Sequence, residues 1–393
     1  MGLCTAGAFF SEEKLKIEVN NETEKRILEY LDRERINTDI REGIAGPFSS
    51  GFVFDEEELL RCAEVLREDL RKSGRNYNKD QAVMAMMVID QITENLGVEG
   101  EELPVPDTVI DKIVEYSKVF HEGDFGENPY LKNISFDRQS SGDFTLTHGA
   151  YEPYEGFHYN TPVSEFRGIL IPRLGTFTYR QEFPCISEKD VTWMSVTPNE
   201  IYTMEKHINE ASGKVLTLGL GMGYYTYMVS IKDDVESVTV IEKSQDVIDL
   251  FKKYILPQFS HPEKINILCD DAFKFIDTVE DGEYDCCFAD IWKGNNDILP
   301  YLELKIACER FRRMKVTYWI EDALSAAVMS YVFVSILDDF CSEKGIRLPD
   351  TAALPEDEKF KHGFVAGLLM EQTINRAQDV DYFMSYENIC SLL

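Results

Sequence analysis

The sequence is short of basic residues. It contains 40 Lys and Arg against 71 Asp and Glu in 393 residues, which gives a formal net charge of −31 at pH 7. Proteins that bind nucleic acid need clusters of Lys and Arg at the phosphates. This composition therefore argues against a nucleic-acid substrate and favours a small-molecule, cationic or protein partner.

Paired cysteines and long apolar runs are also lacking. The nine cysteines show no CxxC spacing and no small-domain disulfide framework, which is typical of a reducing compartment. The N-terminus lacks the basic region and apolar core of a secretion signal. The longest apolar run, Leu324 to Leu337, is shorter than a membrane span. We therefore expect a cytoplasmic protein without a membrane segment.

The length and composition predict a folded chain of two or three domains, since 44% of the residues are hydrophobic and 28% are charged. The sequence pattern changes at three places. It predicts an N-terminal helical domain over 1–125, an aromatic-rich irregular segment with a β-hairpin over 126–192, an α/β domain over 193–345 and a C-terminal helical extension over 346–393.

Helix signals dominate the first of these parts. Asn21 with Glu24 and Asp55 with Glu58 have the spacing of capping boxes ahead of apolar periodic segments. The apolar, methionine-rich stretch 82–96 predicts a buried central helix. None of these features indicates a chemistry.

Helical periodicity stops between residues 121 and 165, where glycine, asparagine and aromatic residues alternate. Long irregular segments often form lids or binding loops, although the aromatics could equally fill a seam between domains. Two apolar runs follow, at 166–171 and 176–183, separated by Pro172 and Gly175. We predict that these runs form a hairpin.

A glycine-rich loop marks the centre of the α/β part. Apolar residues of a predicted strand lead into Gly219, Gly221 and Gly223, and a second β-branched run ends at Glu242. Thr197, Pro198 and Glu200 give a strong helix start before it. Strand, glycine loop, helix, strand and carboxylate is the form in which α/β proteins bind an adenosine-containing cofactor.

Strand and helix patterns continue to alternate after Glu242, with further strands predicted at 265–268, 284–289 and 316–320. Five such units imply an α/β fold with a doubly wound, mostly parallel sheet. Ligands are then expected beyond the carboxyl ends of the strands.

The glycine spacing argues against a nicotinamide cofactor. A dinucleotide fingerprint needs glycine at the first, third and sixth positions, and the sixth position counted from Gly219 is Tyr224. The sequence is instead GLGMG. This spacing and the units after it, over about residues 193–340, resemble the Rossmann-like class I S-adenosylmethionine-dependent methyltransferases.

The resemblance implies S-adenosylmethionine as the cofactor and assigns roles to several residues. An acid at the position of Glu242 binds the ribose hydroxyls, Asp271 of an Asp-Ala pair faces the adenine amino group, and Asp290 lies at the reactive end as a candidate base. Tyr225 and Trp292 are candidates for the acceptor pocket, and no metal is expected. The implied cofactor contacts are Gly219, Leu220, Gly221, Met222, Gly223, Tyr224, Glu242, Lys243, Asp271, Ala272 and Asp290.

Thr217 departs from the pattern, because many class I methyltransferases have an acid two residues before the first glycine. The branch that resembles spermidine synthases also lacks this acid, and it shares the Asp-Ala pair. Its aminopropyl-transfer motif is Asp-x-x-Asp-Pro, whereas this chain has Asp290-Ile291-Trp292-Lys293. The sequence is therefore nearest to that branch but lacks its second acid.

The leading hypothesis from sequence is methyl transfer from S-adenosylmethionine to a small-molecule or protein acceptor. Aminopropyl transfer from decarboxylated S-adenosylmethionine to an amine is the first alternative, and a non-catalytic cofactor-binding protein is the second. A nicotinamide oxidoreductase would need glycine at Tyr224. The apolar helix after Asp322 is compatible with either a homodimer interface or a place in the core.

Overall fold

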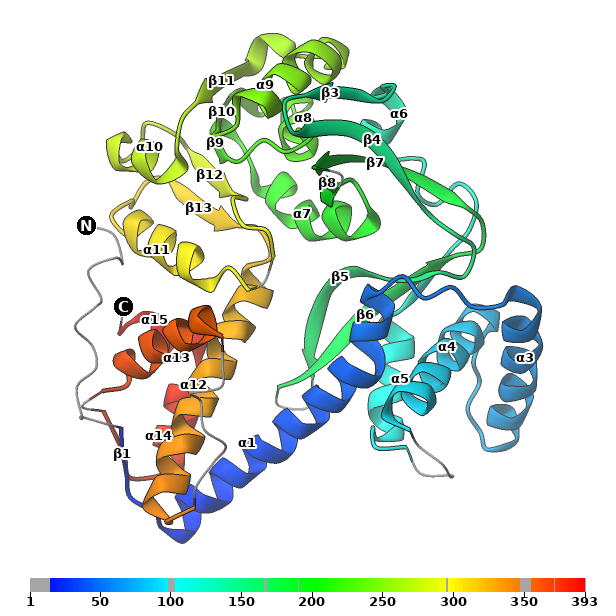
Figure 1. The fold of residues 1–393 in the computed structure, drawn as a ribbon, viewed down its shortest axis with the longest axis vertical. Coiled ribbons are helices and arrows are strands. Elements are labelled where there is room, and N and C mark those ends of the chain that lie inside the picture. Colours follow the sequence, from blue (N-terminus) through cyan, green and yellow to red (C-terminus); the bar gives the residue numbers. More distant parts are fainter. Residues whose placement is uncertain are drawn as a thin grey trace. The chain divides into compact units, whose positions relative to one another are not determined.

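The fold was analysed in a computed structural model that describes residues 15–97, 103–165, 168–189, 191–294, 296–346, 355–370 and 372–392. The chain divides into two compact units (Figure 1). The larger unit comprises Glu34–Ile291 and Phe311–Trp319. The smaller unit comprises Met1–Arg33, Trp292–Arg310 and Ile320–Leu393.

The larger unit contains a five-stranded parallel sheet (Figure 1). Its order is β11-β10-β9-β12-β13, and every neighbouring pair is parallel. This is the doubly wound, Rossmann-like α/β fold that the sequence predicts. The strands are β9 (Gly213–Leu218), β10 (Val235–Glu242), β11 (Ile265–Cys269), β12 (Cys286–Ala289) and β13 (Lys315–Tyr318).

Helix α7 (Pro198–Glu210) precedes β9. After β9, β10 and β11 come α8 (Tyr224–Ser230), α9 (Gln245–Leu250), which continues as a π-turn over Phe251–Ile255, and α10 (Ala272–Thr278). Helices α8, α9 and α10 all contact β10. The capping box expected at α7 is present, with Thr197 and Glu200 as its two members.

The core of this α/β region is made by the central strands and the helices against them. Val215, Leu216 and Leu218 of β9 are fully buried, as are Val238 and Val240 of β10. A run of apolar residues suits a central parallel strand, because both of its faces are covered. The burial of β9 fixes the position of the loop that follows it.

The helices before the sheet largely agree with the sequence pattern. They are α1 (Asn21–Ile40) with a π-turn at Arg41–Ala45, α2 (Gly46–Ser49), α3 (Glu56–Lys72), α4 (Lys79–Leu96), α5 (Asp107–Tyr116) and α6 (Pro129–Asn133). Asp55 caps α3 through Glu58 N at 2.9 Å, as expected. The cap of α1 is one residue earlier than predicted, because the Asn20 side chain accepts from Glu22 N and Thr23 N. Helix α4 is the buried methionine-rich helix.

The prediction of an irregular segment followed by one hairpin is wrong. Two further sheets occupy this part of the chain. One is mixed, in the order β2-β6-β5, and the other is antiparallel, in the order β3-β4-β7-β8. Their strands are β2 (Lys118–Phe120), β3 (Gln139–Ser141), β4 (Phe144–Tyr151), β5 (Gly156–Glu165), β6 (Ile169–Phe177), β7 (Gln181–Glu188) and β8 (Val191–Ser195). The predicted turn at 172–175 lies inside β6, and the second predicted run, 176–183, is divided between β6 and β7, which belong to different sheets.

The hairpin prediction was wrong because it took two residues, a proline and a glycine, as the marks of a turn. Pro172 lies inside β6 where the register with β5 shifts between Asn160 and Val163, and such an irregularity tolerates a missing N–H. Gly175 also lies inside β6, where a Cβ would be 2.6 Å from the ring of Phe157. The glycine therefore serves packing rather than a turn.

The C-terminal part of the smaller unit contains α12 (Glu321–Glu343), α13 (Glu356–Leu368), α14 (Ala377–Phe383) and α15 (Tyr386–Cys390), and α11 (Ile298–Cys308) belongs to the same unit. The short strand β1 (Lys16–Ile17) pairs in parallel with β14 (Thr373–Ile374). By length and composition α12 could cross a membrane, but 44% of its most apolar window is buried, and core helices meet the same criterion.

Candidate functional site

The sheet is extended in opposite directions from β9. Strands β10 and β11 extend the sheet to one side of β9, while β12 and β13 extend it to the other. In open α/β sheets the crevice for a ligand lies at this switch point, beyond the carboxyl ends of the two strands. The glycine loop follows β9 and Asp290 follows β12, so the fold brings these two predicted elements together.

Backbone contacts fix the loop against Asp290. Asp290 N donates to Leu218 O at 2.8 Å, and Gly219 N donates to Ile241 O at 2.8 Å. Gly219 has φ +98°, and a Cβ there would lie 2.0 Å from the carbonyl oxygen of Asp290. Glycine is therefore required both for the backbone conformation and for the close approach of the two strand ends.

The other two glycines pack against side chains. Gly221 has φ +52°, and its Cβ would lie 1.9 Å from Sδ of Met194. Gly223 has φ +71°, and its Cβ would lie 2.2 Å from the ring of Phe251. Met194 of β8 and Phe251 of the π-turn that continues α9 thus pack closely against the loop.

The side chains between the glycines face the protein interior. Leu220 and Met222 are buried, and so are Tyr224 and Tyr225. The hydroxyl of Tyr224 accepts a hydrogen bond from Asn128 Nδ2 at 3.0 Å. What the loop can present to a ligand at these positions is therefore mainly its backbone, while the side chains of Leu220, Met222 and Tyr224 contribute to the core.

Tyr225 and Trp292, the predicted acceptor-pocket residues, are both packed. Tyr225 stacks on Phe288 of β12 with ring centroids 4.1 Å apart. Trp292 is 5% exposed and meets Tyr301 edge to face within the smaller unit, at 5.8 Å. Each aromatic has a structural role in the unit to which it belongs.

Glu242 ends β10 and holds the glycine loop. Its Oε2 accepts from Leu220 N at 3.1 Å and its Oε1 accepts from Ser244 N at 2.7 Å. Burial raises the pKa of Glu242, and the hydrogen bonds from Ser244 and Leu220 oppose that rise. Each carboxylate oxygen keeps a second lone pair, so the geometry leaves capacity for ribose hydroxyls.

Asp271 combines capping with an ion pair. Its Oδ1 accepts from Phe273 N at 3.1 Å and Lys274 N at 3.3 Å, which caps α10. Its Oδ2 lies 3.2 Å from Lys243 Nζ, and Ala272 is the first residue of the helix. Partial burial alone would raise the pKa of Asp271, but the hydrogen bonds and the Lys243 charge lower it.

Asp290 has the most perturbed carboxyl group of the switch point. Burial raises its pKa to about 8, and the charges of Glu200 and Glu242 add to the rise. Its side chain accepts no hydrogen bond from the described part of the chain, and part of the residue remains accessible. A carboxyl group of this kind is suited to exchange protons near neutral pH.

Glu200 is the acid that the sequence reading assigned to capping alone. Its carboxylate accepts from Thr197 N at 3.1 Å, from the Thr197 hydroxyl and from the Ser195 hydroxyl at 3.2 Å. Burial raises the pKa of Glu200, and the hydrogen bonds from Thr197 oppose the rise. The charge of Glu200 adds to the raised pKa of Asp290, and only the position of Glu200 in the capping box was visible in the sequence.

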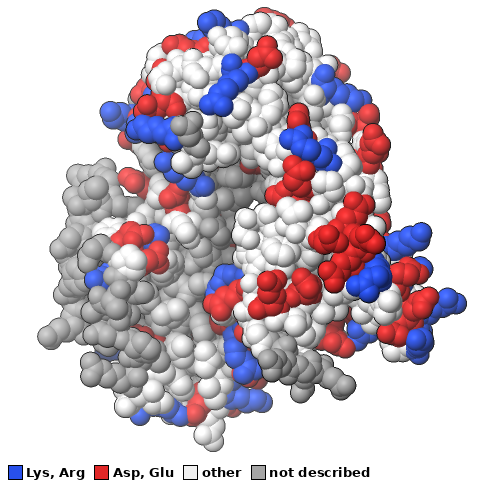
Figure 2. Space-filling model, turned by 45° about the vertical axis from the view of Figure 1, so that its right-hand side comes forward, with Lys and Arg blue, Asp and Glu red and all other residues white. Residues whose placement is uncertain are grey.

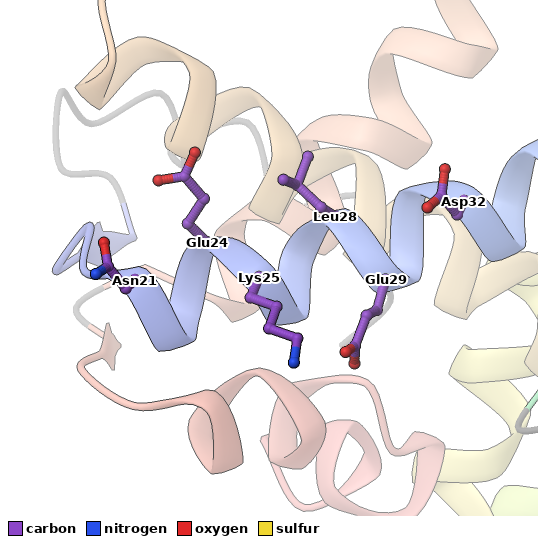
Figure 3. Close-up of a pocket in the computed structure, with 6 residues that line it drawn as sticks. All are labelled: Asn21, Glu24, Lys25, Leu28, Glu29 and Asp32. Carbon is purple, nitrogen blue, oxygen red and sulfur yellow. The ribbon is translucent and has the colours of Figure 1, made fainter.

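Other parts of the described chain offer weaker sites. Among the described residues no three His, Cys, Asp or Glu are grouped so as to hold a metal ion. A hollow of about 400 Å³ lies along one face of α1 (Figure 3). Two of its acids, Glu24 and Glu29, already pair with Lys344 and Arg26. It is lined by Asn21, Glu24, Lys25, Leu28, Glu29 and Asp32.

Replacing Glu242 with Gln should destabilise the glycine loop that its carboxylate holds. One oxygen becomes an amide that faces an N–H group, so one of the hydrogen bonds to Leu220 or Ser244 is lost. We expect a fall of about 1–3 kcal/mol in the free energy of unfolding, measured by urea denaturation. Glu236→Gln, at an exposed position of the same strand, is the matched control. Equal stability of the two variants would contradict the role of Glu242 in holding the loop.

Comparison with known proteins gives one family and several distant structures. The model of the spermine/spermidine synthase domain matches residues 197–298, about a quarter of the chain. No curated protein matches. Among solved structures, spermidine synthase from Thermotoga maritima is 14% identical with a TM-score of 0.28, over 47% of this chain and 55% of that one.

Two further structures are similarly distant. A spermidine synthase in complex with the transition state analogue AdoDATO is 16% identical with a TM-score of 0.29, over 40% of this chain and 59% of that one. A probable spermidine synthase from Corynebacterium glutamicum is 16% identical with a TM-score of 0.24, over 28% of this chain and 45% of that one. The matched part spans about half the length of these structures, and the likeness carries no argument beyond the family match.

The family match corrects the leading hypothesis from sequence. Residues 197–298 contain the glycine loop, Glu242, Asp271 and Asp290, and the model that matches them is the spermine/spermidine synthase domain. The interpretation of the chain as an S-adenosylmethionine-dependent methyltransferase is therefore wrong, and plain S-adenosylmethionine is not supported as its cofactor. This α/β region is similar to the aminopropyl-transferring branch of the fold.

Proposed function

We propose that this protein transfers an aminopropyl group from decarboxylated S-adenosylmethionine to an amine. The observation that carries the proposal is the spermine/spermidine synthase domain match over residues 197–298, which spans the switch point with the glycine loop and Asp290. The match covers the residues that would bind the donor and the carboxyl group that would receive a proton.

The donor would rest on the glycine loop. The backbone of Gly219 to Gly223 would approach its ribose and side-chain part, and Glu242 would accept from the ribose hydroxyls through its remaining lone pairs. Asp271 would face the adenine amino group while it continues to cap α10. These contacts fit the groups that decarboxylated S-adenosylmethionine shares with S-adenosylmethionine.

The acids of the site favour the decarboxylated donor. The charges of Glu200 and Glu242 both raise the pKa of Asp290, so the three carboxyl groups lie close enough to repel one another. A donor that carries its own carboxylate would add a further negative charge beside these acids. The decarboxylated donor instead offers an ammonium and a sulfonium. The sequence carries 71 acids against 40 Lys and Arg, and groups of acids are visible on the face in Figure 2.

Asp290 is suited to deprotonate the acceptor. An ammonium must lose a proton before its nitrogen can attack the methylene next to the sulfonium. The C–N bond then forms as the C–S bond breaks, and the electron pair of that bond stays on sulfur as a neutral thioether. The proton passes to Asp290, whose pKa of about 8 suits this exchange. The protein otherwise aligns the two reactants and excludes water.

A donor titration tests the proposal. Purified protein is titrated by calorimetry with decarboxylated S-adenosylmethionine, S-adenosylmethionine, S-adenosylhomocysteine and NAD, and amine products are followed by mass spectrometry. We expect the decarboxylated donor to bind about tenfold or more tightly than S-adenosylmethionine, the effect of one unpaired charge near other acids. Preference for S-adenosylmethionine, no binding at millimolar donor, or binding without transfer to any amine would each overturn the proposal.

A further inference from the structure

One arginine of the small sheet β2-β6-β5 has no partner. Arg173 of β6 is half-buried, and its Nε is buried without a hydrogen-bond partner in the described part of the chain. Arg75 and Arg180, by contrast, each pair with a carboxylate at 2.5 Å. The sequence contains 71 acids, so a shortage of carboxylates does not explain the difference. Buried donors in native proteins are nearly always hydrogen-bonded, and an orphaned one is expected where a ligand binds.

A lysine lies beside Arg173 on the same face of this sheet. Gly175 follows Arg173 by two residues, so both face the same side of β6, and Lys118 of β2 is paired with Gly175. A Cβ on Gly175 would lie 2.6 Å from the ring of Phe157 and 3.1 Å from that of Phe120. This face therefore carries the aromatic cluster of the sheet together with two cations.

Aromatic groups, and no acid of the described residues, position the Lys118 ammonium. Its Nζ donates to the hydroxyl oxygen of Tyr202 at 2.9 Å and lies 4.5 Å from the ring centroid of Phe120. Tyr202 belongs to α7, which lies against β5. Since the Tyr202 oxygen accepts from Lys118, its own O–H can donate to a ligand. Lys118 and Tyr202 are both half-buried, so they remain accessible.

Tyr159 lies next to both Arg173 and Tyr202. It precedes Asn160, which is paired with Arg173, and its ring meets that of Tyr202 edge to face at 5.2 Å. Burial raises the pKa of Tyr159 and the charge of Arg173 opposes the rise, in agreement with this register. The Tyr159 hydroxyl donates to Tyr116 O at 2.7 Å. Its ring is therefore a fixed wall between the guanidinium and α7.

We propose that Lys118, Arg173 and Tyr202 bind the phosphate group of a small ligand. The planar guanidinium fits two phosphate oxygens, the ammonium supplies a second charge, and the tyrosine hydroxyl donates to a third oxygen. A phosphate ester carries nearly two negative charges at neutral pH, which matches the two cations. A carboxylate would leave one cation uncompensated.

The overall charge limits the size of this ligand. With a formal net charge of −31, the protein would repel a long polyanion, so a single phosphate group on a small molecule fits best. Lys118 and Arg173 both precede the residues that match the family model, 197–298. The phosphate site is therefore independent of the proposed aminopropyl transfer.

Calorimetry tests the site on the full-length protein. Inorganic phosphate, phenyl phosphate and acetate are titrated at slightly alkaline pH into the wild type, Arg173→Gln, Lys118→Gln and Arg180→Gln. Arg180 is an exposed arginine of the same unit that already pairs with Glu152 and Glu182, so its variant is the matched control.

We expect the wild type and Arg180→Gln to bind phosphate about tenfold or more tightly than acetate. Arg173→Gln and Lys118→Gln should each lose about tenfold or more in phosphate affinity, the effect of one charge-assisted hydrogen bond. Tighter binding of phenyl phosphate would support an organic phosphate as the ligand, and equal binding would support free phosphate. No binding at millimolar phosphate, a preference for acetate, or an equal loss in Arg180→Gln would overturn the proposal.

Thermal unfolding distinguishes a ligand site from a structural role of Arg173. Arg173→Met removes the orphaned buried N–H but keeps a long side chain, so the free variant should unfold at or above the midpoint of the wild type. Phosphate should raise the midpoint of the wild type and not that of the variant. A lower midpoint of the free variant, or an undiminished response to phosphate, would overturn the assignment of Arg173.

Discussion

Replacing Gly219 with alanine is expected to lower the free energy of unfolding by about 2–5 kcal/mol, through backbone strain and a backbone clash. The residue has φ +98°, outside the range that L-residues normally adopt, and its Cβ would lie 2.0 Å from the Asp290 carbonyl oxygen. Neither strand end can move away at low cost, because Asp290 N donates to Leu218 O and Gly219 N donates to Ile241 O. Donor binding should be lost with the loop geometry.

The matched control is Gly126→Ala. Gly126 belongs to the same unit, has no positive φ, and no atom lies within 4 Å of the place of its Cβ. That variant should remain within about 0.5 kcal/mol of the wild type. Urea denaturation of both variants gives the comparison. A Gly219→Ala protein as stable as Gly126→Ala would show that the two strand ends do not approach as closely as described.

Local signals account for the parts of the fold that were predicted. The capping box at Thr197 and Glu200, the apolar strand before Gly219 and the acid at the end of β10 are patterns within a few residues. Alternation of such patterns is enough to imply a parallel sheet, because parallel strands need crossover helices. The strand ends, and with them Glu242, Asp271 and Asp290, could therefore be located from the sequence alone.

Pairing between strands that are distant in the sequence explains why the hairpin prediction was wrong. Strand β6 pairs with β5 and β2, and β7 pairs with β4 and β8, although β6 and β7 are neighbours in the sequence. A break between two apolar runs was interpreted as a turn. The glycine at the break makes room for Phe157 from another strand, and no local pattern reports that contact.

The same limit applies to the site. Glu200 satisfies a helix cap with residues three and five positions away, so its sequence context is complete without a ligand. Its charge affects the pKa of Asp290, a residue 90 positions further along the chain, and no local pattern reports that. The spacing of the glycines in the sequence likewise does not show that the side chains of Leu220, Met222 and Tyr224 are buried in the core. Methyl and aminopropyl donors share most of their atoms, so the glycine loop alone could not distinguish between them.

Asp290→Asn is expected to reduce aminopropyl transfer by about 100-fold to 10,000-fold, the usual contribution of a general base. In the wild type, kcat/KM should rise with pH as Asp290 ionises, reach half of its plateau near pH 8 and level off about one pH unit higher. The variant should show a low rate without that rise. Asp233→Asn, which changes an exposed acid of the same unit, should retain the wild-type profile. An unchanged pH profile in Asp290→Asn would show that another group takes the proton.

The same substitution should stabilise the fold at high pH. The pKa of Asp290 is about 8 in the folded protein, against about 3.9 for an unperturbed Asp in the unfolded chain. Between these values the folded state holds a proton that the unfolded state has released, so the contribution of Asp290 to stability falls as the pH rises from about 4 to about 8. Asparagine stays neutral throughout.

The free energy of unfolding of Asp290→Asn should equal that of the wild type near pH 4 and exceed it by about 2–4 kcal/mol at pH 9. This range is reduced for the partial exposure of the residue. Urea denaturation at both pH values measures the difference, and a difference that did not change with pH would mean that Asp290 is ionised in the folded protein across this range.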